Sequence, residues 1–146
     1  MVRTRLDILP GNLADKIAKA TDEQKRAICL AACKIAVRRT GTSEQLVEAA
    51  LRSLEKGHYE DASVTAGLKR LVDDFDAKYF DAQELYEAGK GTKEAYLAIF
   101  QKARAVNAVL FAFNDDPFMA ACESLYEAGA AADVVDDALA LLRDGH

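Results

Sequence analysis

Residues 21–41 read TDEQKRAICLAACKIAVRRTG and mark both ends of one amphipathic helix. Thr21 and Gln24 have the spacing of a capping box, in which the threonine hydroxyl accepts a backbone N–H and the glutamine reaches back. Gly41 follows a basic turn, where a left-handed residue commonly ends a helix. The sequence therefore predicts a helix over residues 22–40. Its apolar stripe, at steps of three and four, is Ile28, Ala31, Ala32, Ile35 and Ala36.

The following segment repeats these signals. Thr42 and Gln45 have the same capping spacing, and Gly57 supplies the next stop, so a second helix is expected between them. The link of only two residues between the first and second helix, 41–42, predicts that these helices form an antiparallel hairpin. Beyond Gly57, apolar residues keep helical spacing from Val64 to Tyr86, either as one helix or as two helices around residues 76–81.

The second half of the chain carries further helix boundaries. Thr92 is expected to cap a helix after the glycine-containing turn at residues 89–91, and Pro117 to start another after Asn114-Asp115-Asp116. Between Ala105 and Phe113 the only polar side chain is Asn107, so this helix is expected at the centre of the core. Asn107 must then find internal hydrogen bonds or point outward. The last helices are expected over about 118–128 and 134–143.

A five-residue echo links two of these helices. LYEAG occurs at residues 85–89 and again at 125–129, and each glycine is expected to end its helix in the left-handed conformation. The echo suggests a pseudo-repeat of helical hairpins, although two short copies do not define a solenoid. No segment alternates as a strand does, and no linker divides the chain. We therefore expect an all-α, single-domain bundle over residues 1–146, with about six to eight antiparallel helices.

The charge is distributed unevenly along the chain. The net charge is −5, but residues 1–58 hold 11 basic and 7 acidic side chains, whereas residues 59–146 hold 8 and 17. An acidic second half repels nucleic acid and anionic membranes and attracts a basic partner. The first thirty residues are charged throughout, Lys102 and Arg104 interrupt the most apolar helix, and three cysteines form an odd set. These features favour a cytoplasmic protein without a signal peptide or a transmembrane segment.

The candidate metal and catalytic groups are few. Cys29 and Cys33 lie one helical turn apart and could supply two metal ligands, but alanines share their face, so packing is the favoured interpretation. Glu55 and His58 have the spacing of a di-iron ligand pair, which Gly57 would break, and His146 ends the chain. Phosphate loops, nucleophile elbows and dinucleotide motifs are absent from the sequence. We expect no catalytic, cofactor or metal site, and hence no enzyme.

The strongest candidate site is an acidic and aromatic segment between residues 73 and 87. Aromatic side chains among carboxylates are typical anchors of protein contact surfaces, although a solvated helix face with core aromatics would have the same composition. Phe75, Phe80 and Tyr86 are aromatic residues of this segment. The residues predicted to bind a partner are Asp73, Asp74, Asp76, Tyr79, Asp81, Glu84 and Glu87.

Three alanine-rich stretches carry a family resemblance. They are ICLAAC at 28–33, EAALRSLEKG at 48–57 and AACE at 120–123. With them the chain resembles the small all-helical immunity proteins of bacterial polymorphic-toxin systems. The resemblance implies a protein that binds one cognate toxin in the producing cell and occludes its active site without chemistry. The acidic half suits a basic toxin domain such as a nuclease.

Two other functions stay open from the sequence. One is a helical adaptor or regulatory protein-interaction module with no toxin. The other is an enzyme or metal-binding bundle whose ligands follow no recognised motif.

Overall fold

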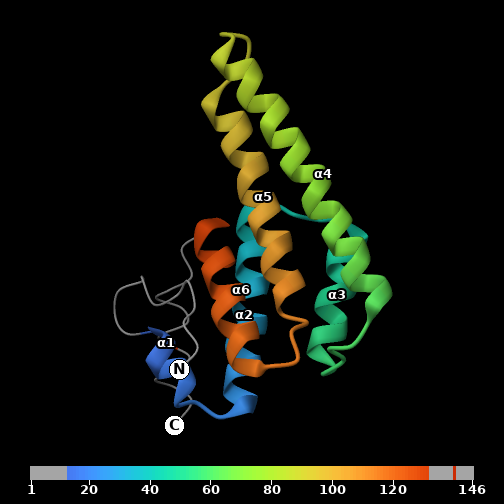
Figure 1. Ribbon diagram of the computed structural model, residues 1–146, viewed down its shortest axis with the longest axis vertical. Helices are drawn as coiled ribbons and strands as arrows, with labels where there is room; N and C mark the ends of the chain where they lie inside the picture. The colour runs from blue at the N-terminus through green and yellow to red at the C-terminus, as the bar shows by residue number, and fades with distance from the viewer. Residues whose placement is uncertain (1–12, 132–139, 141–146) are drawn as a thin grey trace.

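The chain folds as an all-α bundle. The computed structural model describes residues 13–131 and residue 140, and the described residues form six α-helices and no strand (Figure 1). The sequence prediction of an all-α bundle is therefore confirmed, while the helix expected over 134–143 lies outside the described residues. None of the described helices has the length and apolar character needed to cross a membrane. The helices are α1 (Leu13–Ala18), α2 (Asp22–Thr40), α3 (Gln45–Glu55), α4 (Ala62–Glu87), α5 (Lys93–Phe111) and α6 (Pro117–Ala131).

Both ends of α2 have the capping structures that the sequence predicts. Thr21 Oγ1 accepts the backbone N–H of Gln24 at 3.1 Å, and Gln24 Oε1 accepts the backbone N–H of Thr21 at 2.8 Å. This reciprocal pair satisfies two of the amide groups that a helix start leaves open. At the other end Gly41 has a φ of 69°, the left-handed conformation that glycine adopts at little cost. Both predicted boundaries of α2 are confirmed.

The predicted cap at Thr42 is wrong. The backbone N–H of Thr42 bonds to Val37 O at 3.1 Å and so helps to end α2, which prevents the residue from starting α3. Its side chain is buried, with Oγ1 2.7 Å from the hydroxyl of Thr40. The start of α3 falls instead after Glu44, whose side chain makes no capping hydrogen bond.

The core lies where α2, α5 and α6 meet. The most extensive packing is of α4 on α5, of α2 on α6 and of α5 on α6. The residues of α5 from Ala103 to Val109 are almost all buried, which confirms that this helix is central. On α2 the buried face is rotated slightly from the predicted stripe, because Cys29, Cys33 and Val37 are buried while Ala31 and Ile35 are only half-buried.

One long helical hairpin gives the molecule its shape. The helix α4 runs unbroken for 26 residues, so the question of a kink at residues 76–81 is settled in favour of one helix. Thr92 Oγ1 caps α5 by accepting the Ala95 N–H at 3.1 Å, as predicted. The far halves of α4 and α5 project together beyond the other helices (Figure 1). The candidate site described below lies on this projection.

The LYEAG echo does not correspond to a structural repeat. Gly89 has a φ of 76° and ends α4 at the tip of the hairpin, where the chain reverses. Gly129 instead lies inside α6, which continues to Ala131, so its predicted left-handed stop is wrong. The surroundings explain the difference, since Leu85 is exposed at the tip whereas Leu125 is fully buried in the core. The start of α6 does follow prediction, because Asp116 Oδ1 accepts the Phe118 N–H at 2.9 Å and Pro117 is the first helical residue.

Candidate protein-binding site

The projecting part of the α4–α5 hairpin carries the large hydrophobic side chains that are exposed among the described residues. We call this part, residues 76–104, the arm. The large hydrophobic side chains that the described residues expose are Phe80 at 59%, Leu85 at 50%, Tyr86 at 42% and Leu97 at 39%. All four belong to the arm. Exposed aromatic and aliphatic side chains gathered on one projection are the usual mark of a contact surface for another macromolecule.

Aromatic rings hold the two helices of the arm together. Tyr79 lies at the centre, with ring centroids 5.3 Å from Phe80, 5.8 Å from Tyr96 and 5.5 Å from Phe100. Tyr86 continues the series with its ring 5.3 Å from Tyr96. Tilted and edge-on pairs at these separations are favourable beyond the area they bury. The arm is therefore a stiffened pair of helices with aromatic side chains along its length.

The base of the arm is fixed by a charged network that joins three helices. Arg104 of α5 donates to Asp76 Oδ1 of α4 at 3.1 Å and to Glu127 Oε2 of α6 at 3.2 Å. Glu127 is only 2% exposed, and its other oxygen accepts Asn107 Nδ2 at 3.0 Å. The expectation that Asn107 finds an internal hydrogen bond is therefore confirmed. A buried carboxylate persists only where cations and donors compensate it, and here they do.

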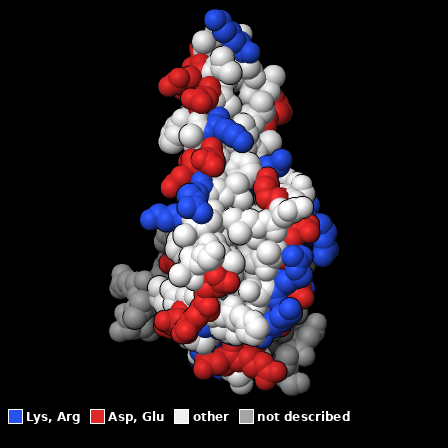
Figure 2. All heavy atoms as spheres, turned by 90° about the vertical axis from the view of Figure 1, so that its right-hand side faces the viewer, with Lys and Arg blue, Asp and Glu red and all other residues white. Residues whose placement is uncertain are grey.

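The predicted partner-binding residues divide into two groups. Asp76 and Tyr79 are half-buried and make contacts inside the arm, the first with Arg104 and the second with neighbouring rings. The other five are exposed, and no ion pair formed within the described residues neutralises them. Figure 2, which views the molecule from the α4 side, shows acidic side chains along the projecting part with basic side chains between them. The exposed five are Asp73, Asp74, Asp81, Glu84 and Glu87.

Two of these carboxylates lie at the unfavourable end of their helix. Glu87 is the last residue of α4 and Glu84 lies one turn before it, and the last turn contains no basic side chain. Because the carboxyl end of a helix carries partial negative charge, acidic residues there reduce its stability. A local conflict of this kind often marks a residue kept for function rather than for folding.

The structure also adds residues that the sequence did not single out. Leu85 and Leu97 are exposed on the arm, whereas Phe75, considered as an interface aromatic, is buried in the core. Helical spacing could have distinguished Phe75 as a core residue from Phe80 as an exposed one, because residues five positions apart lie on different faces of α4. No local signal distinguishes Leu97 from a core leucine, since its exposure depends on how far the hairpin projects.

The cysteines are packed in the core. All three thiols are buried, and Cys29 Sγ donates to Ser124 Oγ at 3.3 Å while Cys33 Sγ donates to Ala108 O at 3.4 Å. Hydrogen bonding of the Cys33 thiol to the ionised form of Cys29 lowers the pKa of Cys29 against the effect of burial. The same interaction with Cys29, together with burial, raises the pKa of Cys33 well above its usual value.

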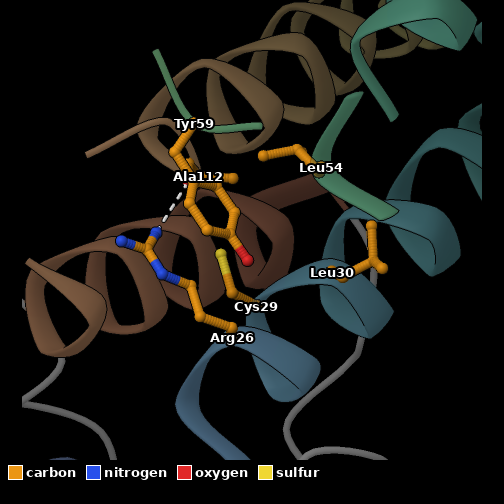
Figure 3. A pocket seen from close by; sticks show the side chains of 6 residues that line it. All are labelled: Arg26, Cys29, Leu30, Leu54, Tyr59 and Ala112. Atoms are coloured by element: carbon orange, nitrogen blue, oxygen red, sulfur yellow. Dashed lines mark hydrogen bonds between the residues drawn. The ribbon is translucent and has the colours of Figure 1, made fainter. Parts of the chain in front are cut away.

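A small cavity lies beside Cys29 (Figure 3). Its volume is about 10 Å³, close to the space of one water molecule and far below that of a substrate. Arg26 lines it, with its guanidinium 3.9 Å from the centre of the Tyr59 ring and donating to Ala112 O at 3.2 Å. The cavity is therefore a packing feature at the junction of α2, α3, the end of α5 and the link before α4.

Metal ligation finds no support in the geometry of the described residues. Within residues 13–131 no three His, Cys, Asp or Glu side chains come together as a metal-binding group. Glu55 pairs with Lys34 at 2.7 Å, and Gly57, with a φ of 76°, separates it from His58. His146 lies outside the described residues.

Comparison of the chain with protein-family models, with curated proteins and with solved structures finds no match in any of the three.

Proposed function

We propose that this protein acts by binding a protein partner through its arm, without catalysis. The observation that carries the proposal is the gathering on one projection of the large hydrophobic side chains that the described residues expose. They lie next to carboxylates that form no ion pair with other described residues. An aromatic surface of this kind supplies the central anchors of an interface, and the surrounding charges steer the approach of the partner.

The specific form that we propose is immunity against a cognate bacterial toxin. The acidic second half of the sequence suits a basic toxin domain, and the arm has the shape to enter or cover a concave active site. Neutralisation then requires occlusion alone. The proposed partner-binding set remains the seven residues named from the sequence, with Asp76 and Tyr79 supporting the arm from within.

The experiment is affinity capture from the native cell with this protein as bait, at low and high salt, followed by growth assays of the captured partner. The proposal expects one basic partner whose retention weakens at high salt. Expression of that partner alone should arrest growth, and co-expression with this protein should restore it. A captured partner that is harmless would turn the function to that of an adaptor, and the absence of any stoichiometric partner would contradict the proposal altogether.

A further inference from the structure

We infer that the partner segment held by the arm is a cationic amphipathic helix, which lies along one side of the arm with an apolar residue against Phe80. The inference rests on the partner-binding function proposed above. It adds the side of the arm that is used and the chemistry of the segment that covers it.

The Asp76–Arg104 ion pair identifies the residues that share one side of the arm. Residues four or seven positions apart lie on the same face of a helix. Phe80 is four residues after Asp76 on α4, and Leu97 and Phe100 are seven and four residues before Arg104 on α5. Because the ion pair joins the two faces at 3.1 Å, the three apolar side chains line one side of the arm. Tyr79 forms its floor, since its ring contacts both Phe80 and Phe100.

The same side has an excess of negative charge. On α4, Asp73, Glu84 and Glu87 lie seven residues before, four after and seven after Phe80, and all three are exposed without an ion pair among the described residues. Lys69, four residues before Asp73 on α4, and Lys93 on α5 are also exposed on this side and offset part of this charge. An apolar centre between uncompensated carboxylates is complementary to an apolar residue flanked by Lys or Arg.

The neighbouring face of α4 is less suited to such a partner. Asp74, Lys78, Asp81 and Leu85 follow one another at helical spacing, so one lysine lies between the two aspartates. This face carries one exposed apolar side chain and a smaller excess of charge. It therefore provides a matched control on the same helix.

We call the exposed carboxylates on this side of α4, Asp73, Glu84 and Glu87, the acidic stripe. The length of the acidic stripe sets the size of the partner segment. From Asp73 to Glu87 the helix rises about 21 Å, which a helix of about 15 residues would match. Such a segment would add a third helix to the arm and bury its apolar side, as amphipathic helices do in hydrophobic grooves. The predicted pattern is an apolar residue near the middle of the segment with basic residues one to two turns away on each side.

The test uses the full-length protein and synthetic helical peptides of about 15 residues. One peptide has a Leu/Lys amphipathic pattern, and a second replaces each Lys by Glu. Dye-labelled peptide is titrated with protein at low and high salt, and circular dichroism checks the helicity of every variant. The variants are Phe80→Ala, the pair Glu84→Gln/Glu87→Gln, and the control pair Asp74→Asn/Asp81→Asn.

The inference predicts salt-sensitive binding of the Leu/Lys peptide and no binding of the Leu/Glu peptide. Phe80→Ala should weaken binding about tenfold, because the peptide no longer buries the ring. Glu84→Gln/Glu87→Gln should weaken it about fivefold, and the control pair less than about twofold. Equal losses in the two charge pairs, or undiminished binding by Phe80→Ala, would overturn the inference.

The two proposals fail in different ways. If a native partner is captured but the stripe variants retain it as well as the wild type, the inference falls and the proposed function stands. If no partner is captured from the cell, the proposed function falls, and the peptide titration alone decides whether the arm has the inferred chemistry.

Discussion

Arg104 of α5 donates to the nearly buried Glu127 of α6 across 3.2 Å, and the same guanidinium reaches Asp76 on α4. One side chain thus ties the root of the arm to the core of the bundle. Since none of the other described helices lies beside the far half of the arm, the orientation of the arm depends on such contacts at its base (Figure 1).

Truncating Glu127 should destabilise the protein far more than truncating a surface partner. Glu127→Ala leaves Arg104 and Asn107 with unsatisfied donors in a largely buried site, so we expect a loss of about 2–4 kcal/mol in the free energy of unfolding. The matched control is Glu55→Ala, because Glu55 pairs with Lys34 at 2.7 Å with both side chains more than 40% exposed. That variant should lose less than about 1 kcal/mol despite its shorter distance. Urea unfolding measures both, and similar losses would contradict the structural role of the network.

Arg26 should be poorly replaced by lysine. Its guanidinium donates to Ala112 O at 3.2 Å and to Asp115 O at 2.9 Å, and it stacks over the Tyr59 ring. A lysine keeps the charge but loses the planar fork that makes these contacts together. Arg26→Lys should therefore lower the free energy of unfolding by about 1–2 kcal/mol. The control is the substitution Arg52→Lys at an exposed position. An equal loss of stability in the two variants would contradict the role of the planar guanidinium of Arg26 in these contacts.

The sequence predicted helix boundaries where the local signal was sufficient and failed where tertiary packing decided. The capping box at Thr21 formed, but the similar pattern at Thr42 did not, because that backbone was already engaged in ending α2. Likewise Gly89 ends a helix at an open tip, while Gly129 continues one inside the core. The five-residue sequence that ends at Gly89 is identical to the one that ends at Gly129, so only the surroundings of the two glycines distinguish their conformations.

The candidate site was predicted in part for the same reason. The acidic segment is visible in the sequence, since six carboxylates fall within residues 73–87. That Asp76 is used internally by Arg104 depends on a contact 28 residues away in sequence, which no local pattern reveals. The projection of the arm beyond α6 and α2 likewise follows from relative helix lengths and packing, and it exposes Leu97.

The acidic end of α4 should reduce stability in the unbound protein. Replacing Glu84 and Glu87 by Gln removes two negative charges from the carboxyl end of the helix, which should stabilise it by about 0.3–1 kcal/mol for each residue. Asp74→Asn/Asp81→Asn removes the same number of charges further from that end and should change stability less. Thermal unfolding compares the two pairs. A stability gain confined to the control pair would contradict the argument that Glu84 and Glu87 are kept for binding.

The thiols should differ in reactivity. Cys29 lines the small cavity and has a lowered pKa, whereas the pKa of Cys33 is raised, so Cys29 holds the larger thiolate fraction. Under mild alkylation of the folded protein, peptide mass spectrometry should find Cys29 modified before Cys33, although slowly because both are buried. Modification of Cys33 first would contradict the described arrangement of the pair.

The most direct test of the account is hydrogen–deuterium exchange of this protein with and without its captured partner. If the arm is the binding surface, amide protection should increase within residues 76–104 and in the adjoining helical turn of α4 around Asp73. The amides of α1, α2 and α3 should keep their exchange rates. Protection confined to α1, α2 or α3, with an arm that exchanges as in the free protein, would contradict the central claim.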